Sequence, residues 1–262
     1  MIWLAGNRPN LNGVASLSLQ DPSNQPLNGR VRFDNVSLRR GGTTVFAGLS
    51  LDLQEQRIGI IGNNGSGKSS LLRLINGLLL PNGGSVTVCG YDTKAHRREL
   101  PRLAGFLFQN AEHQILFPTA GEEIAFGLRE AGMDARNAEK KAAGILAANG
   151  CSDWLHRPVQ ELSDGQKQRL CIFAIMAMQP QILLLDEPFA SLDLPTRKAI
   201  SKHILSLPQQ VIMASHDFDL LARFERIIWL DGGRVVADGA AGRILADYRR
   251  SVLGESELAD AS

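Results

Sequence analysis

The chain has 262 residues, of which 44% are hydrophobic and 21% charged, and its formal net charge is +1. This composition predicts a folded α/β domain with room for a helical subdomain and argues against disorder. A charge so close to zero also argues against a general nucleic-acid binder, which normally carries a strong basic excess.

The cysteines and the apolar runs limit the function further. Three cysteines lie far apart with no CxxC pair, so we expect small buried hydrophobes in a reducing cytosol. The longest apolar run, Leu170–Met178, is nine residues, about half the length of a membrane-spanning helix. The first residues also lack the basic and apolar regions of a signal peptide. A membrane role would therefore require a partner.

The N-terminal part of the chain is expected to contain a leader and an antiparallel sheet. Residues 1–29 are rich in Asn, Ser, Pro and Gly, show no sustained period, and are predicted to form a loose leader. From Arg30, apolar residues alternate as in strands, with a turn at Gly41-Gly42. The alternating positions are Val31, Phe33, Leu49, Leu51 and Leu53.

A glycine-rich stretch follows, with the pattern G-x-x-x-x-G-K-S from Gly62 to Ser69. The apolar run before it, Ile58–Ile61, predicts a buried strand, and a helix is expected from Lys68 to about Leu79. The glycines allow backbone N–H groups to point at one anion, and the helix N-terminus adds its own N–H groups. Lys68 is suited to the β- and γ-phosphates and Ser69 to Mg²⁺. We predict a nucleoside triphosphate site formed by Asn63, Asn64, Gly65, Ser66, Gly67, Lys68, Ser69 and Ser70.

The middle of the chain is predicted to be largely helical. A strand over 85–89 precedes a basic patch, for which a solvated surface is the preferred interpretation. Another strand over 104–108 ends at Gln109. Helices are expected over 122–131, from the N-cap Asp134 to Gly150, and from Ser163 to the residues before Pro180, giving a helical subdomain over about 110–179. The patch comprises Lys94, His96, Arg97, Arg98 and Arg102.

Strands and helices alternate again from Gln181. Strands are expected over 182–185, 211–214, 227–230 and 235–237, a final helix over 241–249, and an acidic tail over 251–262. The first of these strands ends in Asp186 and Glu187. An acid at the carboxyl end of a strand neighbouring the phosphate loop would face Mg²⁺, which suits Asp186, and Glu187 would polarise the attacking water. A strand that simply ends in solvent is the alternative, which the phosphate loop disfavours.

The stretch Leu162-Ser163-Asp164-Gly165-Gln166 begins a Ser-capped helix, whose N-terminus can also bind an anion. Here the chain resembles the ABC ATPases, whose signature reads Leu-Ser-Gly-Gly-Gln. The resemblance covers about 30–250 and implies an α/β P-loop NTPase fold: a RecA-like core sheet, an antiparallel β subdomain and a helical signature subdomain. It also implies ATP and Mg²⁺ as cofactors, and ATP hydrolysis as the activity.

The resemblance assigns roles to matching positions. Gln109 matches the Q-loop glutamine, implying a Mg²⁺ ligand beside Ser69 and Asp186. Glu187 and His216, with Gln109, are implied as the catalytic residues. The segment Ser191-Leu192-Asp193 matches the D-loop. In the family the signature faces the nucleotide held by the other ATPase subunit, and the residues implied here are Ser163, Gly165 and Gln166.

Two positions depart from the family pattern. Asp164 replaces the usual third-position glycine, but a carboxylate in a first helical turn suits the helix dipole, so we expect activity to survive. Arg40 occupies the place of the aromatic residue that commonly stacks on adenine. Its guanidinium plane could stack on the base instead, and a loosely held adenine is the alternative.

The segment from Phe106 to Leu128 resembles the energy-coupling factor (ECF) group of vitamin and metal importers, although Ala111 replaces a usual Pro. The resemblance implies a groove for cytoplasmic helices of a transmembrane T-component, a substrate-binding S-component, and a position on the cytoplasmic face of the cell membrane. Biotin importers are the favoured match and cobalt or nickel importers the runners-up. A homodimer is expected because the chain retains the hydrolysis and signature residues and Asp164 is at a tolerant position; those retained are Lys68, Gln109, Ser163, Gly165, Asp186, Glu187 and His216.

Two rival classes remain. Soluble ABC proteins that act on nucleic acid or ribosomes usually carry two nucleotide-binding units or a long coiled coil, and neither is found here. A small-molecule P-loop kinase would have no use for the signature. No nucleic-acid partner is therefore expected.

Overall fold

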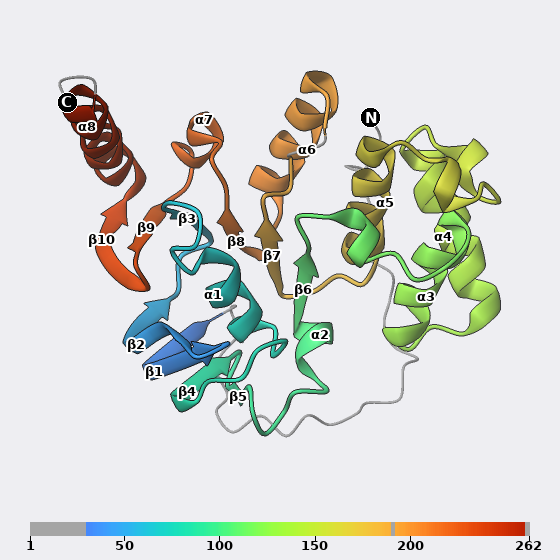
Figure 1. The fold of residues 1–262 in the computed structure, drawn as a ribbon. Coiled ribbons are helices and arrows are strands. Elements are labelled where there is room, and N and C mark those ends of the chain that lie inside the picture. The colour runs from blue at the N-terminus through green and yellow to red at the C-terminus, as the bar shows by residue number, and fades with distance from the viewer. Residues whose placement is uncertain (1–29, 190–191, 260–262) are drawn as a thin grey trace.

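The computed structural model describes residues 30–189 and 192–259, with side chains as far as Val252. The predictions for residues 1–29 and for Ser191 lie outside these ranges. Two sheets form the body of the domain (Figure 1). The smaller is four-stranded and antiparallel, in the order β2-β1-β4-β5. Its strands are β1 (Val31–Arg40), β2 (Thr43–Leu53), β4 (Gly83–Val88) and β5 (Tyr91–Asp92).

The larger sheet has six strands in the order β10-β9-β3-β8-β7-β6. All neighbouring strands in it pair parallel except β10, which is antiparallel to β9. Its strands are β3 (Arg57–Ile61), β6 (Ala104–Leu107), β7 (Ile182–Asp186), β8 (Gln210–Ala214), β9 (Arg226–Asp231) and β10 (Arg234–Ala240). The sequence analysis placed the strand that ends in Asp186 next to the phosphate-loop strand, and this was wrong. β8 lies between β3 and β7, so Asp186 ends the next strand but one.

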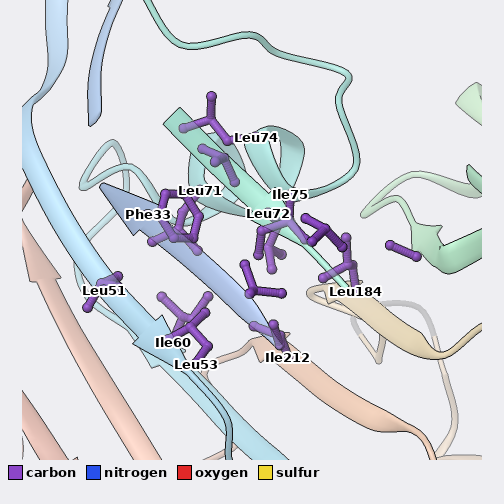
Figure 2. Packing of buried hydrophobic residues seen from close by; sticks show 14 of the residues in the cluster. Phe33, Leu51, Leu53, Ile60, Leu71, Leu72, Leu74, Ile75, Leu184 and Ile212 are labelled. Carbon is purple, nitrogen blue, oxygen red and sulfur yellow. The ribbon is translucent and has the colours of Figure 1, made fainter. Parts of the chain in front are cut away.

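The parallel strands are buried on both faces, which explains their nearly continuous apolar sequences. Alternate residues face different clusters: Leu184 and Ile212 belong to the cluster shared with the antiparallel sheet, whereas Leu183 and Met213 belong to the opposite one. Helix α1 (Lys68–Ile75) lies between the two sheets, and its Leu71, Leu72 and Leu74 pack beside residues of both (Figure 2).

The opposite face of the parallel sheet is covered by the later helices of the chain. They are α6 (Leu194–Ser206), α7 (Phe218–Leu221) and α8 (Ala241–Ala259). Ile244 and Leu245 of α8 are buried against the sheet. This packing holds the C-terminal helix beside β9 and β10, and β9 is the strand that pairs with β3.

A third cluster forms the core of a helical subdomain, at the right of Figure 1. Its helices are α3 (Ala120–Glu130), α4 (Ala135–Ala148) and α5 (Asp164–Ala177), with 3₁₀ turns at 111–113, 152–154 and 159–161. Asp134 caps α4 through the N–H of Asn137, and Gly150 follows its end with a φ of 69°, both as predicted. A short helix, α2 (Leu100–Leu103), precedes β6.

Two predicted helix ends were wrong. Helix α1 ends at Ile75 rather than near Leu79, because Gly77 has a φ of 75°, which a right-handed helix does not allow. Helix α8 continues to Ala259 through the predicted tail, which contains no proline to interrupt it, although Gly254 lowers the helix propensity there. Among the helices in the described part of the chain, none is long and apolar enough to cross a membrane.

Candidate functional site

The phosphate loop joins β3 to α1 and packs directly against neighbouring backbone. A Cβ on Gly62 would lie 2.0 Å from the carbonyl oxygen of Leu230, and one on Gly67 would lie 2.8 Å from the ring of Phe46. Gly62, Gly65 and Gly67 have φ angles of 142°, 81° and 110°. Conformation and close approach both require glycine at positions 62 and 67, whereas at Gly65 conformation alone does.

Lys68 begins α1 and folds back over this loop. Its ammonium group donates to the carbonyls of Gly62 at 2.7 Å and Asn63 at 3.1 Å. Burial lowers the pKa of Lys68, although Glu187 and Asp186 oppose that effect. The hydroxyl of Ser66 is buried without a hydrogen-bond partner in the described residues. The Lys68 ammonium group and the unpaired Ser66 hydroxyl lie beside a glycine-rich loop, and this arrangement suits the phosphates of a nucleotide.

Asp186 meets the phosphate-loop helix from the end of β7. The Ser69 hydroxyl donates to Oδ1 of Asp186 at 3.0 Å, and Asp186 is only 2% exposed. Burial raises the pKa of Asp186, and the Ser69 hydrogen bond and the Arg73 and Lys68 charges counter it. Among the described residues, no group of three or more His, Cys, Asp or Glu is arranged to hold a metal ion by itself. One carboxylate and one hydroxyl fit Mg²⁺, which takes its remaining ligands from phosphates and water.

Glu187 follows with an unusual backbone conformation. Its φ is 49°, and its N–H donates to the carbonyl of Ala214 at 2.9 Å, which ties it to the end of β8. Its Oε1 lies 3.4 Å from Nε2 of His216. Burial raises the pKa of Glu187, and the nearby His216 and Lys68 act in the opposite direction. The structure thus brings Lys68, Ser69, Asp186, Glu187 and His216 together at one place.

The signature residues lie elsewhere. Ser163 caps α5 and forms a reciprocal capping box with Gln166. Helix α5 belongs to the helical subdomain, whereas the phosphate loop joins β3 to α1 on the other side of β6 and β7 (Figure 1). The side chain of Asp164 is 82% exposed and lies 3.9 Å from Lys167. Gln109 is exposed two residues after β6.

Arg40 lies at the exposed end of β1, beside the turn into β2. The next strand brings Val45 and Phe46 against Gly67 of the phosphate loop, so this hairpin flanks the site. Sequence reasoning missed Phe46, because only the later half of β2 was recognised as a strand. It also missed Gly233, whose N–H donates to the Ser66 carbonyl at 3.2 Å. A Gly-Gly pair between two apolar strands was the available signal.

Comparison with known proteins agrees with this geometry. The family profile described as ABC transporter matches residues 46–190. The biotin transport ATP-binding protein BioM of Rhodobacter capsulatus is 49% identical over 214 residues, covering 82% of this chain and 92% of that protein. The chain belongs to the ABC transporter family. It is an ATP-binding ATPase subunit of that family.

Two further relatives refine this placement of the ABC ATPase. The energy-coupling factor transporter ATP-binding protein EcfA of Methanothermobacter thermautotrophicus is 34% identical over 230 residues, covering 84% of this chain and 74% of that protein. The dimeric post-hydrolysis structure of the ATP-binding cassette MJ0796, bound to ADP and Pi, superposes with a TM-score of 0.71 at 27% identity, covering 80% and 98% of the two chains. The predicted P-loop fold and ATPase activity are confirmed.

Proposed function

We propose that the chain is the motor subunit of an ECF-type importer that takes up a vitamin, with biotin the favoured substrate. The 49% identity to BioM over most of both chains carries this proposal. The similarity to EcfA supports the ECF group. The subunit would act at the cytoplasmic face of the membrane, held there by a transmembrane T-component and working with a substrate-binding S-component.

The proposed working unit is a homodimer with two composite sites. Each site takes its phosphate loop, Asp186 and Glu187 from one copy. The remaining wall, Ser163 to Gln166, comes from the other copy, which accounts for the position of the α5 N-terminus away from its own phosphate loop. The dimeric neighbour bound to ADP and Pi supports this arrangement. An intact set of site residues in one sequence lets both sites be equivalent.

Within each site the chain's residues divide the chemistry of ATP hydrolysis. Lys68 would exchange its loop carbonyl partners for phosphate oxygens, and Ser69 and Asp186, with Gln109, would hold Mg²⁺. The metal, when bound, offsets phosphate charge. Glu187 is half-buried, and its Oε1 has no hydrogen-bond partner in the described residues and lies 3.4 Å from Nε2 of His216; it would accept a proton from water. His216 would contact the γ-phosphate region, and Arg40 would stack on the base.

The helical subdomain carries a groove suited to the proposed T-component. A cavity of about 510 Å³ is lined largely by apolar residues, and Leu116 at its edge is 72% exposed. Lys167 and Glu112 form an ion pair of 2.6 Å at the same site. An amphipathic helix from the T-component would cover this surface. The lining residues are Glu112, Ile115, Leu116, Phe117, Pro118, Pro158, Val159, Gln160 and Lys167.

Membrane purification of the chain expressed from its native operon tests these assignments. We expect a complex with two copies of this ATPase, a T-component and an S-component, and uptake of labelled biotin that a deletion strain loses. Leu116→Asp should reduce co-purification, whereas Val236→Asp, at another exposed apolar residue, should not. Cobalt or nickel uptake in place of biotin would refute the substrate. A second ATPase chain would refute the homodimer, and ribosomes or RNA would refute the importer.

A further inference from the structure

The C-terminal helix contacts the phosphate loop through one tyrosine. Tyr248 of α8 is 7% exposed, and its hydroxyl donates to Oδ1 of Asn63 at 3.4 Å. The two residues are separated by 185 positions in the chain. Asn63 immediately follows Gly62 at the start of the loop. Helix α8 therefore reaches a segment that the proposed function places around the phosphates.

The backbone carbonyl of Asn63 accepts two hydrogen bonds that hold the phosphate loop in its fold. It accepts the ammonium group of Lys68 at 3.1 Å and the N–H of Ser66 at 3.1 Å. Asn63 thus connects Lys68, Ser66 and the C-terminal helix α8. The Lys68 and Ser66 bonds reach the backbone of Asn63, whereas the Tyr248 bond reaches its side chain, so a shift of the whole residue would displace two groups that are expected to contact phosphate oxygens.

Aromatic packing fixes the ring that carries this hydroxyl. The Tyr248 ring lies edge-on to Trp229 of β9, with centroids 5.1 Å apart, and to Phe218 of α7, with centroids 5.6 Å apart. The guanidinium of Arg249 lies 5.7 Å from the centre of the Phe218 ring. Phe218 begins α7 two residues after His216. Tyr248 therefore contacts both the phosphate loop and the element that follows His216.

We infer that Tyr248 is a positioning residue for nucleotide binding, which holds Asn63 so that the phosphate loop is preorganised. A phenylalanine would satisfy the packing against Trp229 and Phe218 equally well. The hydroxyl is needed only for polar contacts, and a buried tyrosine hydroxyl is costly unless it finds a partner. Lys68 and Ser66 would contact phosphates before and during hydrolysis. Loosening their support is therefore expected to raise KM for MgATP and to leave kcat nearly unchanged.

The test is steady-state hydrolysis of MgATP by the purified transporter carrying Tyr248→Phe. Losing one hydrogen bond should raise KM by about three- to tenfold, with kcat within about twofold of wild type. Tyr91→Phe is the matched control, because it removes the chain's other tyrosine hydroxyl from β5 of the antiparallel sheet, and it should leave KM unchanged. An unchanged KM in Tyr248→Phe would overturn the inference.

A double-mutant cycle with Asn63→Ala separates positioning from general loosening. If the tyrosine acts through Asn63, adding Tyr248→Phe to Asn63→Ala should raise KM no further. A further rise of the original size would show that the ring change acts elsewhere, and would overturn the inference. The inference rests on the proposed role of the phosphate loop. If the wild-type protein failed to bind MgATP, the proposed role of the loop would be refuted. If the wild-type protein bound MgATP normally and Tyr248→Phe left KM unchanged, only the positioning role of Tyr248 would be refuted.

Discussion

Replacing Glu187 by glutamine removes the site carboxylate that is not assigned to Mg²⁺, while keeping the shape of the side chain. Asp186, the other site carboxylate, already accepts a hydrogen bond from Ser69 and is assigned to Mg²⁺. Glu187 has no hydrogen-bond partner at Oε1 within the described residues, and its N–H bond to Ala214 involves only backbone atoms, so glutamine can preserve it. The variant should therefore fold normally and bind ATP.

The expected loss of turnover depends on whether another group can accept the proton from water. General-base groups contribute about 10²- to 10⁴-fold to rate. The imidazole of His216 lies 3.4 Å from Oε1 of Glu187 and could substitute in part, which favours the lower end of that range. We expect turnover to fall by about 10²-fold or more, which corresponds to about 2.7 kcal/mol or more in the activation barrier. ATP-bound dimers should accumulate because closure no longer leads to hydrolysis.

Phosphate release by the purified complex measures the first effect, and light scattering with and without ATP measures the second. Glu139→Gln makes the same chemical change at an exposed position on α4 and should leave turnover unaltered. Equal melting temperatures would exclude a folding defect. Hydrolysis near the wild-type rate in Glu187→Gln would refute Glu187 as the base.

Three further predictions concern binding and reactivity. Lys68→Ala should weaken ATP binding itself, as measured by equilibrium titration, because it removes charge from the ground state as well as the transition state; wild-type affinity would contradict this. Arg40, as a stacking guanidinium, should allow GTP hydrolysis within about tenfold of ATP, or about 1.4 kcal/mol, and a preference of several hundredfold in a steady-state comparison would exclude it. All three cysteines are free and buried, and burial raises the pKa of Cys171 to about 12, so thiol titration at pH 8 should be slow in native protein and complete only after denaturation. Rapid native labelling of Cys171 would show that the helical region opens.

Short-range features of the site could be predicted from the sequence because each depends on residues only a few positions apart. The glycine pattern and Lys68 specify a phosphate loop, and Ser163 with Gln166 specifies a helix start, which the structure shows as a capping box. The ends of α4 followed from Asp134 and Gly150 for the same reason. Where an end depended on a single backbone angle, as at Gly77, the apolar pattern carried the predicted helix too far.

Contacts between distant segments were decided only by the tertiary structure. Strands buried on both faces have similar apolar sequences, which do not indicate the order of the strands in the sheet. The position of β8 between β3 and β7 could therefore not be predicted. The Ser69–Asp186 hydrogen bond spans 117 positions, and the Tyr248–Asn63 contact spans 185. Phe46 and Tyr248 look like ordinary core residues in the sequence. Their place beside the phosphate loop results from how the antiparallel sheet and α8 pack around β3, because side chains brought together by folding need share no local pattern.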